Sequence, residues 1–185
     1  LTLSIYYVRE TFVISFNTNA AGATGVVSTT PESIEVRYEQ TLELPEVSRT
    51  GHDFTGWYFE SEAQNKIALE YRYLEDKQVY AGWSAKAVGY KVVYQTEQLD
   101  GTYIEYAVVD SKTANADSTI TVTPEKDIPG FTAPEAQQKV VIADGSLVVT
   151  FKYTRNSYKL TLVKDSGVNT FVAQDLTVED GQAYY

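Results

Sequence analysis

Hydrophobic and polar residues alternate along much of the chain. Between Ile34 and Leu44 one parity is apolar except for a single glutamine, and the other parity is polar or charged. The segments 12–16 and 147–153 alternate in the same way. A period of two places every second side chain on the same face of a β-strand, so these segments predict strands with one buried and one wet face. The pattern predicts a mainly β fold, α+β at most, because only 61–75 suggests a short helix.

Asp-Gly dipeptides separate several of the alternating segments. They are Asp100-Gly101, between 90–96 and 103–109, and Asp144-Gly145, between 139–142 and 147–153. This dipeptide is typical of a two-residue β-hairpin, because a type I′ turn needs positive φ at both central residues. We therefore predict a hairpin at each of the two positions.

The chain also contains an internal repeat. Residues 1–10, LTLSIYYVRE, match residues 147–156, LVVTFKYTRN, at an offset of 147 − 1 = 146. The two segments share their strand parity and a Tyr-x-Arg ending, and repetition of this kind is typical of arrays of small modules. We predict four parts: the last strand of a preceding module (1–10), two modules (11–86 and 87–155) and the truncated start of a further module (156–185).

Composition and charge narrow the possible chemistry. The 185 residues carry a formal net charge of −10, which disfavours nucleic acid and anionic glycosaminoglycans as partners. The absence of Cys excludes a disulfide framework, a thiolate nucleophile and a Cys-ligated zinc site, and a single His leaves little for nucleophilic catalysis. No secretory signal and no membrane-spanning apolar run are visible, so we expect a segment of a longer protein.

A core motif in residues 49–58, RTGHDFTGWY, resembles the internalin-type B repeat, also called the Listeria–Bacteroides repeat. That family combines four elements, in this order: a first strand with an Asn/Gly-rich loop, a Leu-x-x-Pro element, a Gly-x-x-Phe-x-Gly-Trp-Tyr motif and a closing strand that ends in Trp. The corresponding segments here are 12–25, 36–45, 51–58 and 79–83. His52 departs from the family pattern, which usually has Tyr at that position.

The second module resembles a spacer repeat related to the repeats of mucin-binding proteins. The resembling segments are 89–95, 99–103, 129–131 and 143–158. Together the two resemblances imply tandem small β-grasp-like modules with mixed or antiparallel sheets, in an extracellular, cell-wall-anchored bacterial surface protein. Neither family brings catalytic, cofactor-binding or metal-ligating residues, so we predict a non-catalytic protein without a cofactor or metal.

Aromatic residues supply the candidate ligand-binding positions. Four tyrosines are expected to be exposed and available to a ligand, because Tyr is frequent at interfaces: Tyr71, Tyr73, Tyr103 and Tyr106. The alternative is that they form stabilising cross-strand pairs. Trp57 and Trp83 could stack on a sugar, but in modules of ~70 residues a large aromatic side chain usually fills the core. His52 is expected in a turn or at the surface.

Two functions follow from these observations. The first is an extracellular stalk or spacer that also serves as an adhesion module, and the alternative is a module that binds carbohydrate or a mucin glycoprotein. The predicted partners are a host glycoprotein or glycan and neighbouring repeats of the same chain, with neither nucleic acid nor membrane insertion. A spacer predicts buried Trp and no pocket, whereas adhesion predicts an exposed aromatic patch or an unpaired strand edge. The end segments 1–8 and 158–185 are expected to pair with each other, with a neighbouring module or with another molecule.

Overall fold

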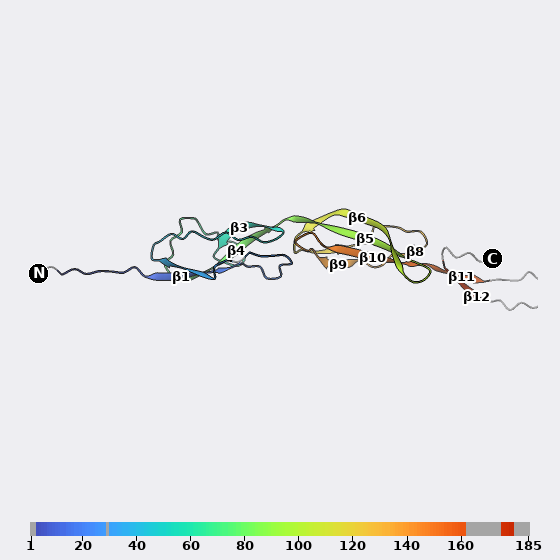
Figure 1. Ribbon diagram of the computed structural model, residues 1–185, viewed down its shortest axis with the longest axis horizontal. Coiled ribbons are helices and arrows are strands. Elements are labelled where there is room, and N and C mark those ends of the chain that lie inside the picture. Colours follow the sequence, from blue (N-terminus) through green and yellow to red (C-terminus); the bar gives the residue numbers. More distant parts are fainter. Residues whose placement is uncertain (1–2, 29, 162–174, 180–185) are drawn as a thin grey trace, which may run out of the picture. The chain divides into compact units, whose positions relative to one another are not determined.

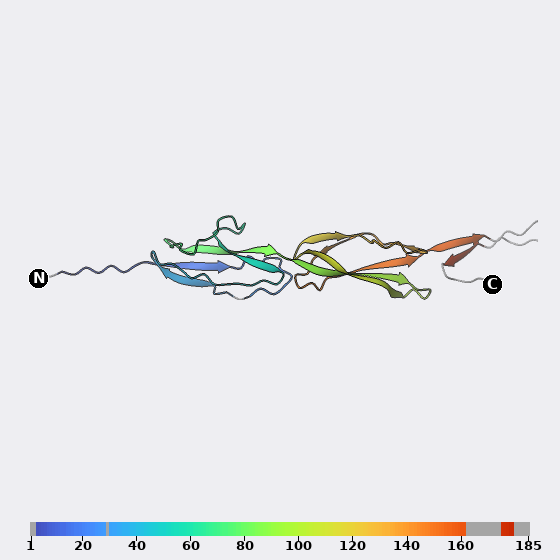
Figure 2. The same cartoon turned by 90° about the horizontal axis from the view of Figure 1, so that it is seen from above.

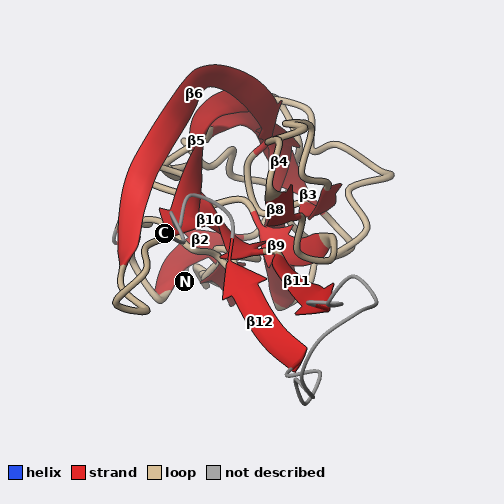
Figure 3. Cartoon of the chain, turned by 90° about the vertical axis from the view of Figure 1, so that its right-hand side faces the viewer, coloured by secondary structure: helices blue, strands red, loops and turns tan. Residues whose placement is uncertain are grey.

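The computed structural model describes residues 3–28, 30–161 and 175–179. These residues form strands, turns and loops but no helix (Figure 3). The prediction of a mainly β fold is confirmed, and the segment 61–75 contains turns in place of the short helix that the sequence allowed. The β-grasp-like detail stays a prediction.

Contacts within the chain divide it into two compact units. The first unit comprises Leu1–Val88, Thr113–Ser118 and Val140–Ser146, and the second comprises Gly89–Lys112, Thr119–Lys139 and Leu147–Tyr185. Two short segments of the predicted second module therefore pack with the first unit. The predicted domain boundaries remain a prediction.

The first unit contains a mixed four-stranded sheet. Its strands are β1 (Thr11–Asn17), β2 (Ser33–Arg37), β3 (His52–Tyr58) and β4 (Lys77–Ala85), in the order β2-β1-β4-β3 (Figure 1). The central pair, β1 and β4, is parallel, and both outer strands are antiparallel to their neighbours. Figure 2 shows β1 (blue) lying between β2 and the green β4.

Alternating side chains of these strands build the first core. Ile14 on β1 and Val79 on β4 are fully buried, and Val36 on β2 is 1% exposed. Val47, Ile67 and Tyr73, from the loops between strands, pack into the same cluster, as do Phe16 and Trp57. Burying apolar side chains at every second position is what the sequence pattern predicts for this sheet.

The second sheet combines β5 (Ala87–Glu97), β6 (Tyr103–Asn115), β8 (Phe131–Thr132) and β10 (Val148–Arg155), in the order β6-β5-β10-β8. β10 runs parallel to β5 and antiparallel to β8, so Phe151 lies beside Tyr94 and Val149 beside Val92. These four residues are buried at 0–1% exposure. Two smaller sheets pair β7 (Thr119–Val122) with β9 (Gln137–Val140), and β11 (Ser157–Thr161) with β12 (Asp175–Glu179).

The Asp-Gly dipeptides form turns of a different kind from the predicted type I′. At Asp100-Gly101 only the glycine has positive φ, +80°, and Gln98 N donates to Thr102 O at 2.7 Å. The hairpin is therefore closed by a three-residue loop with glycine in the left-handed position. Asp144-Gly145 is also a turn, but it forms no hairpin, because β9 pairs with β7 whereas β10 pairs with β5 and β8.

The two end segments do not pair with each other in the part of the chain that the structure describes. Residues 3–10 are extended and lie outside any strand, with Tyr7 92% exposed. Their contacts with the rest of the unit are hydrogen bonds to Tyr38: Tyr38 N donates to Glu10 O, and Arg9 Nη1 donates to Tyr38 O. β11 pairs with β12, from its own end of the chain.

Candidate functional site

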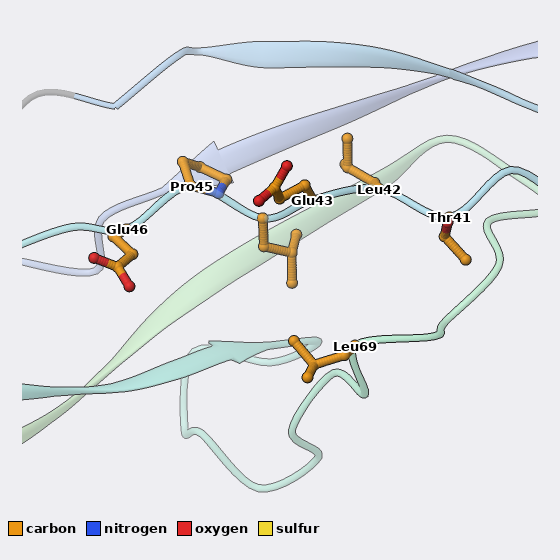
Figure 4. Close-up of a pocket in the computed structure, with 7 residues that line it drawn as sticks. Thr41, Leu42, Glu43, Pro45, Glu46 and Leu69 are labelled. Carbon is orange, nitrogen blue, oxygen red and sulfur yellow. The ribbon is translucent and has the colours of Figure 1, made fainter.

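An open groove lies beside an extended segment of the first unit. The segment 41–46 forms one wall and Leu69, which is 90% exposed, forms the other (Figure 4). The groove has a volume of about 750 Å³ and is lined by Thr41, Leu42, Glu43, Leu44, Pro45, Glu46 and Leu69. Trp57 Nε1 donates to Pro45 O at 2.7 Å and so fixes this wall to the core. The groove combines an apolar lining with the exposed carboxylates of Glu43 and Glu46.

A smaller, more polar pocket lies beside Trp83 in the same unit. Its volume is about 340 Å³, and it is lined by Asn19, Arg49, His52, Ser61, Glu62, Ala63, Gly82, Trp83 and Ala85. Trp83 is half-buried and donates its indole N–H to Thr18 O at 2.8 Å. Its ring packs against Phe54, with centroids 5.5 Å apart. Trp57, by contrast, is 2% exposed, so the core interpretation is confirmed for Trp57 and holds only in part for Trp83.

Two residues with positive φ and the side-chain amide of Asn19 shape this pocket. Asn19 Nδ2 donates to Ser61 O at 2.7 Å and to Ala81 O at 3.2 Å. Asn19 and Ala63 both have positive φ, 50° and 54°, a conformation that non-glycine residues adopt rarely. The hydrogen bonds to Ser61 and Ala81 hold the loop of Asn19 against the strand β4 and the loop after β3.

A buried ion pair supports the wall of the pocket behind Arg49. Arg49 Nη2 lies 2.6 Å from Asp117 Oδ2, with the two side chains 9% and 13% exposed. Thr24 donates its backbone N–H and its hydroxyl to Asp117 Oδ1 at 3.0 and 2.5 Å, and its hydroxyl oxygen accepts from Ala143 N. Burial by itself would raise the pKa of the Asp117 carboxyl, but hydrogen bonds from Thr24 and Arg49 and the charge of Arg49 hold that pKa below its ordinary value.

His52 belongs to this cluster and not to the surface. His52 is the first residue of β3. It follows a turn in which the backbone N–H of His52 donates to Arg49 O, which agrees with the predicted turn. Its side chain is only 6% exposed, and Nε2 lies 3.8 Å from Asp117 Oδ2, while Nδ1 lies 3.0 Å from Thr50 O. The predicted turn is therefore present, and the imidazole lies beside Asp117, a residue far away in the sequence, and not at the surface.

The four candidate tyrosines do not form one site. Tyr71 and Tyr73 lie in the first unit, with ring centroids 4.9 Å apart, and Tyr103 and Tyr106 lie on β6 of the second unit. Tyr73 is 2% exposed, so its expected exposure is wrong: it packs in the core cluster, and burial, with Tyr71 nearby, raises its pKa to about 12. Tyr71 and Tyr106 are exposed at 37% and 54%, and Tyr103 is half-buried under the Lys152 ammonium.

An apolar stripe surrounds Tyr106 on the outer strand of the second sheet. Ile104, Tyr106 and Val108 alternate along β6, so they share one face of the strand, and they are 53%, 54% and 43% exposed. β6 is 13 residues long, and β5 is its neighbour in the sheet order, so its other edge faces no strand in the described part of the chain. Sequence analysis missed Ile104 and Val108, although their alternation with Tyr106 was the available signal.

The described residues provide no constellation for metal chemistry. Residues 3–28, 30–161 and 175–179 contain no group of three or more His, Cys, Asp or Glu that could hold a metal ion. No helix in the same residues has the length and hydropathy to span a lipid bilayer.

The described residues form an all-β fold with mixed and antiparallel sheets. Residues 12–82 match the family model of the Listeria-Bacteroides repeat domain, so the resemblance inferred for the first module is confirmed. The match covers most of the first unit, including β1, β2 and β3.

A comparison with solved structures found the type 2 repeat of the mucus binding protein MUB from Lactobacillus reuteri. It covers 80% of this chain and 100% of that chain, with 9% sequence identity and a TM-score of 0.23. A mucus-binding repeat is thus among the structures to which this chain is similar. A comparison with curated proteins gave no match.

Proposed function

We propose that the chain is a non-catalytic repeat segment of a bacterial cell-surface protein, in which the modules act as an extracellular spacer and the second unit adheres to host glycoprotein. The match of residues 12–82 to a bacterial repeat domain supports the repeat and its surface location. The adhesive role goes beyond that match and rests on the second unit.

The observation that carries adhesion is the exposed edge of β6. An outer strand presents N–H and C=O groups that an extended polypeptide can pair with, and exposed apolar side chains strengthen such a contact. Ile104, Tyr106 and Val108 supply these side chains on a single face. A pure spacer has no need to leave a row of large apolar residues open to water. The partner that fits is an extended segment of a glycoprotein backbone.

Binding to immobilised mucin tests this function, with surface plasmon resonance as the readout. We expect saturable binding by the chain and its loss in the double variant Ile104→Ala/Tyr106→Ala, which truncates two residues of the exposed stripe. Tyr38→Ala is the matched control, since it removes a tyrosine of similar exposure, 40%, from the first unit. Far-UV circular dichroism checks that each variant keeps its strand content. Absence of binding at high micromolar concentration would leave only the spacer function.

A further inference from the structure

We propose that the pocket beside Trp83 is a binding site for a neutral saccharide. The inference deepens the adhesion function proposed above and rests on it for its biological sense, but it concerns a different unit from the β6 edge. Three features of the pocket support a saccharide: a fixed aromatic side chain, polar atoms without partners among the described residues, and a lining whose exposed charge is negative.

Trp83 supplies the aromatic platform. Its indole N–H is held by Thr18 O and its ring packs on Phe54, so the ring keeps one orientation without a ligand. It nevertheless lines the pocket and stays half-buried, whereas Trp57 is closed off in the core. A pyranose ring presents a face of C–H groups that stacks on such an indole, and ligand pockets typically combine an aromatic wall with a few placed polar groups.

Polar atoms without partners surround the indole. Both N–H groups of the Asn19 amide are used by Ser61 O and Ala81 O, and no described residue donates to its side-chain oxygen. The hydroxyl of Ser61 and the carboxylate of Glu62 also line the pocket and make no hydrogen bond within the described residues. Acceptors and a hydroxyl beside an aromatic ring are the chemistry that recognises sugar hydroxyl groups.

The pocket is built in advance of any ligand. Four non-glycine residues in the described part of the chain have positive φ, and two of them, Asn19 and Ala63, line this pocket. A third, Asp117, holds the lining residue Arg49. Backbone strain gathered at one place is typical of functional sites, where the surrounding structure maintains it. Arg49 Nε is in addition buried without a partner, so the wall is not optimised for stability alone.

Charge selects a neutral ligand over an anionic one. The guanidinium of Arg49 is neutralised by Asp117 at 2.6 Å. Glu62 is the exposed charged residue of the lining, and its carboxylate opposes the carboxylate of a sialic acid or the sulfate of a glycosaminoglycan. The volume of about 340 Å³ lies at the lower end of the range for ligand pockets, which suits one or two sugar rings.

The two tryptophans give a direct test by nuclear magnetic resonance. The indole N–H signals, assigned with Trp83→Phe and Trp57→Phe, are followed while the chain is titrated with glucose, galactose, N-acetylglucosamine, N-acetylgalactosamine and lactose, and separately with sialic acid. We expect a saturable shift of the Trp83 signal with at least one neutral sugar, with a Kd near or below ~1 mM, and none of the Trp57 signal. Sialic acid should produce no shift.

Variants at the rim keep the test independent of folding. Ser61→Ala/Glu62→Gln removes the Ser61 hydroxyl and replaces the Glu62 carboxylate acceptor by an amide, and neither side chain hydrogen-bonds another described residue. The double variant should weaken saccharide binding at least about tenfold. Glu43→Gln, in the groove beside Leu69, is the matched control and should leave binding unchanged. No shift of Trp83 with any neutral sugar, or equal binding by the rim variant, overturns the inference.

Mucin binding separates this inference from the proposed function. If the chain binds mucin and the rim variant binds equally well, adhesion stands and the saccharide site falls. If the Trp83 signal responds to a sugar while the chain does not bind mucin, the site stands and the adhesion function falls.

Discussion

The two sheets share one plan and differ in what covers them. In each sheet a parallel pair of strands lies at the centre: β1 and β4 in the first sheet, β5 and β10 in the second. The strand that follows β1 or β5 in the chain, β2 or β6, lies at an edge of its sheet. On that edge strand Val36 of β2 is 1% exposed, whereas Tyr106 of β6 is 54% exposed. Loop residues close the first core over β2, but β6 keeps its apolar stripe open. The two sheets therefore share their strand order, and they differ in whether the apolar residues of the edge strand are covered.

Aromatic composition separates the two units as well. Trp57 and Trp83 both belong to the first unit, whose core also contains Phe16 and Tyr73. The second core instead contains Phe151 and two tyrosines, Tyr94 and Tyr153. Tryptophan fluorescence thus reports on the first unit alone, while circular dichroism reports on both. This difference allows the comparison to be tested one unit at a time.

The largest effects are expected from truncation of the two cores. Phe151→Ala should lower the free energy of unfolding of the second unit by about 3–5 kcal/mol, because the residue is fully buried beside Tyr94. Ile14→Ala, equally buried in the first unit, should cost about 2–5 kcal/mol there. Urea denaturation followed by both probes checks this.

The two probes should respond differently to the two variants. The fluorescence midpoint should move with Ile14→Ala and stay within about 0.5 kcal/mol of the parent with Phe151→Ala, since both tryptophans and Ile14 belong to the first unit whereas Phe151 belongs to the second. The unfolding transition followed by circular dichroism should show the loss of stability in both variants. A fluorescence transition that moves equally with Phe151→Ala would show that the two units unfold as one.

The second effect concerns the buried ion pair of the first unit. Asp117→Asn leaves the Arg49 guanidinium buried without its counter-charge and should destabilise this unit by about 2–3 kcal/mol, read by tryptophan fluorescence in urea. Asparagine tolerates the positive φ of position 117, 60°, so the change tests charge and not backbone strain.

An exposed pair in the second unit is the matched control. Lys112 Nζ lies 2.7 Å from Glu125 Oε1, with side chains 33% and 58% exposed. Glu125→Gln should leave the unfolding transition followed by circular dichroism, which reports on both units, where it is, because water screens an exposed pair. Equal effects of the two substitutions would contradict the assignment of Asp117 to the interior of the first unit.

The same carboxylate predicts a pH dependence. The folded-state pKa of Asp117 is held below the unfolded-state value, about 3.9, so the unfolded state takes up the proton first as pH falls. Its contribution to stability is complete above that unfolded pKa and is lost as pH falls through the folded pKa. The free energy of unfolding should therefore drop below about pH 4 in the parent.

Asp117→Asn isolates this contribution from other carboxyls. Hydrogen bonds from Thr102 and Ser146 also lower the pKa values of Asp100 and Asp144, so the parent alone does not assign the effect. The difference in stability between parent and variant should shrink as pH falls from 5 towards the acid limit. A difference that stays constant over this range would show that Asp117 is not the titrating group.

Sequence analysis predicted the sheets better than the surfaces. Period-two alternation identified strands such as 12–16 and 147–153, because side-chain burial in a strand depends on local parity. The motif at 51–58 was likewise recognised from residues that are adjacent in the chain, and the family match over residues 12–82 confirms it. These features depend on residues close together in the chain.

The candidate site depends on contacts between distant residues, which local patterns do not encode. His52 meets Asp117, 65 positions away, and Trp83 meets Thr18, also 65 positions away. Tyr73 was expected to be exposed because Tyr is frequent at interfaces, yet it packs in the core beside Tyr71. The Asp144-Gly145 turn likewise looked like a hairpin, but the pairing partner of β10 is β5, which lies far earlier in the chain.

The smallest expected loss of stability is that of replacing a turn glycine by alanine, and it should be the same in both units. Gly22 in the first unit and Gly101 in the second both have φ near +80°, 76° and 80°, and a Cβ on either would meet no atom within 4 Å. Alanine at either position should therefore cost only the backbone strain of the left-handed region, about 1 kcal/mol. Fluorescence should detect the first variant and circular dichroism both. A much larger loss for Gly101→Ala would show that the β5–β6 hairpin depends on its turn more than its packing suggests, and that the open edge of β6 is held mainly by that loop.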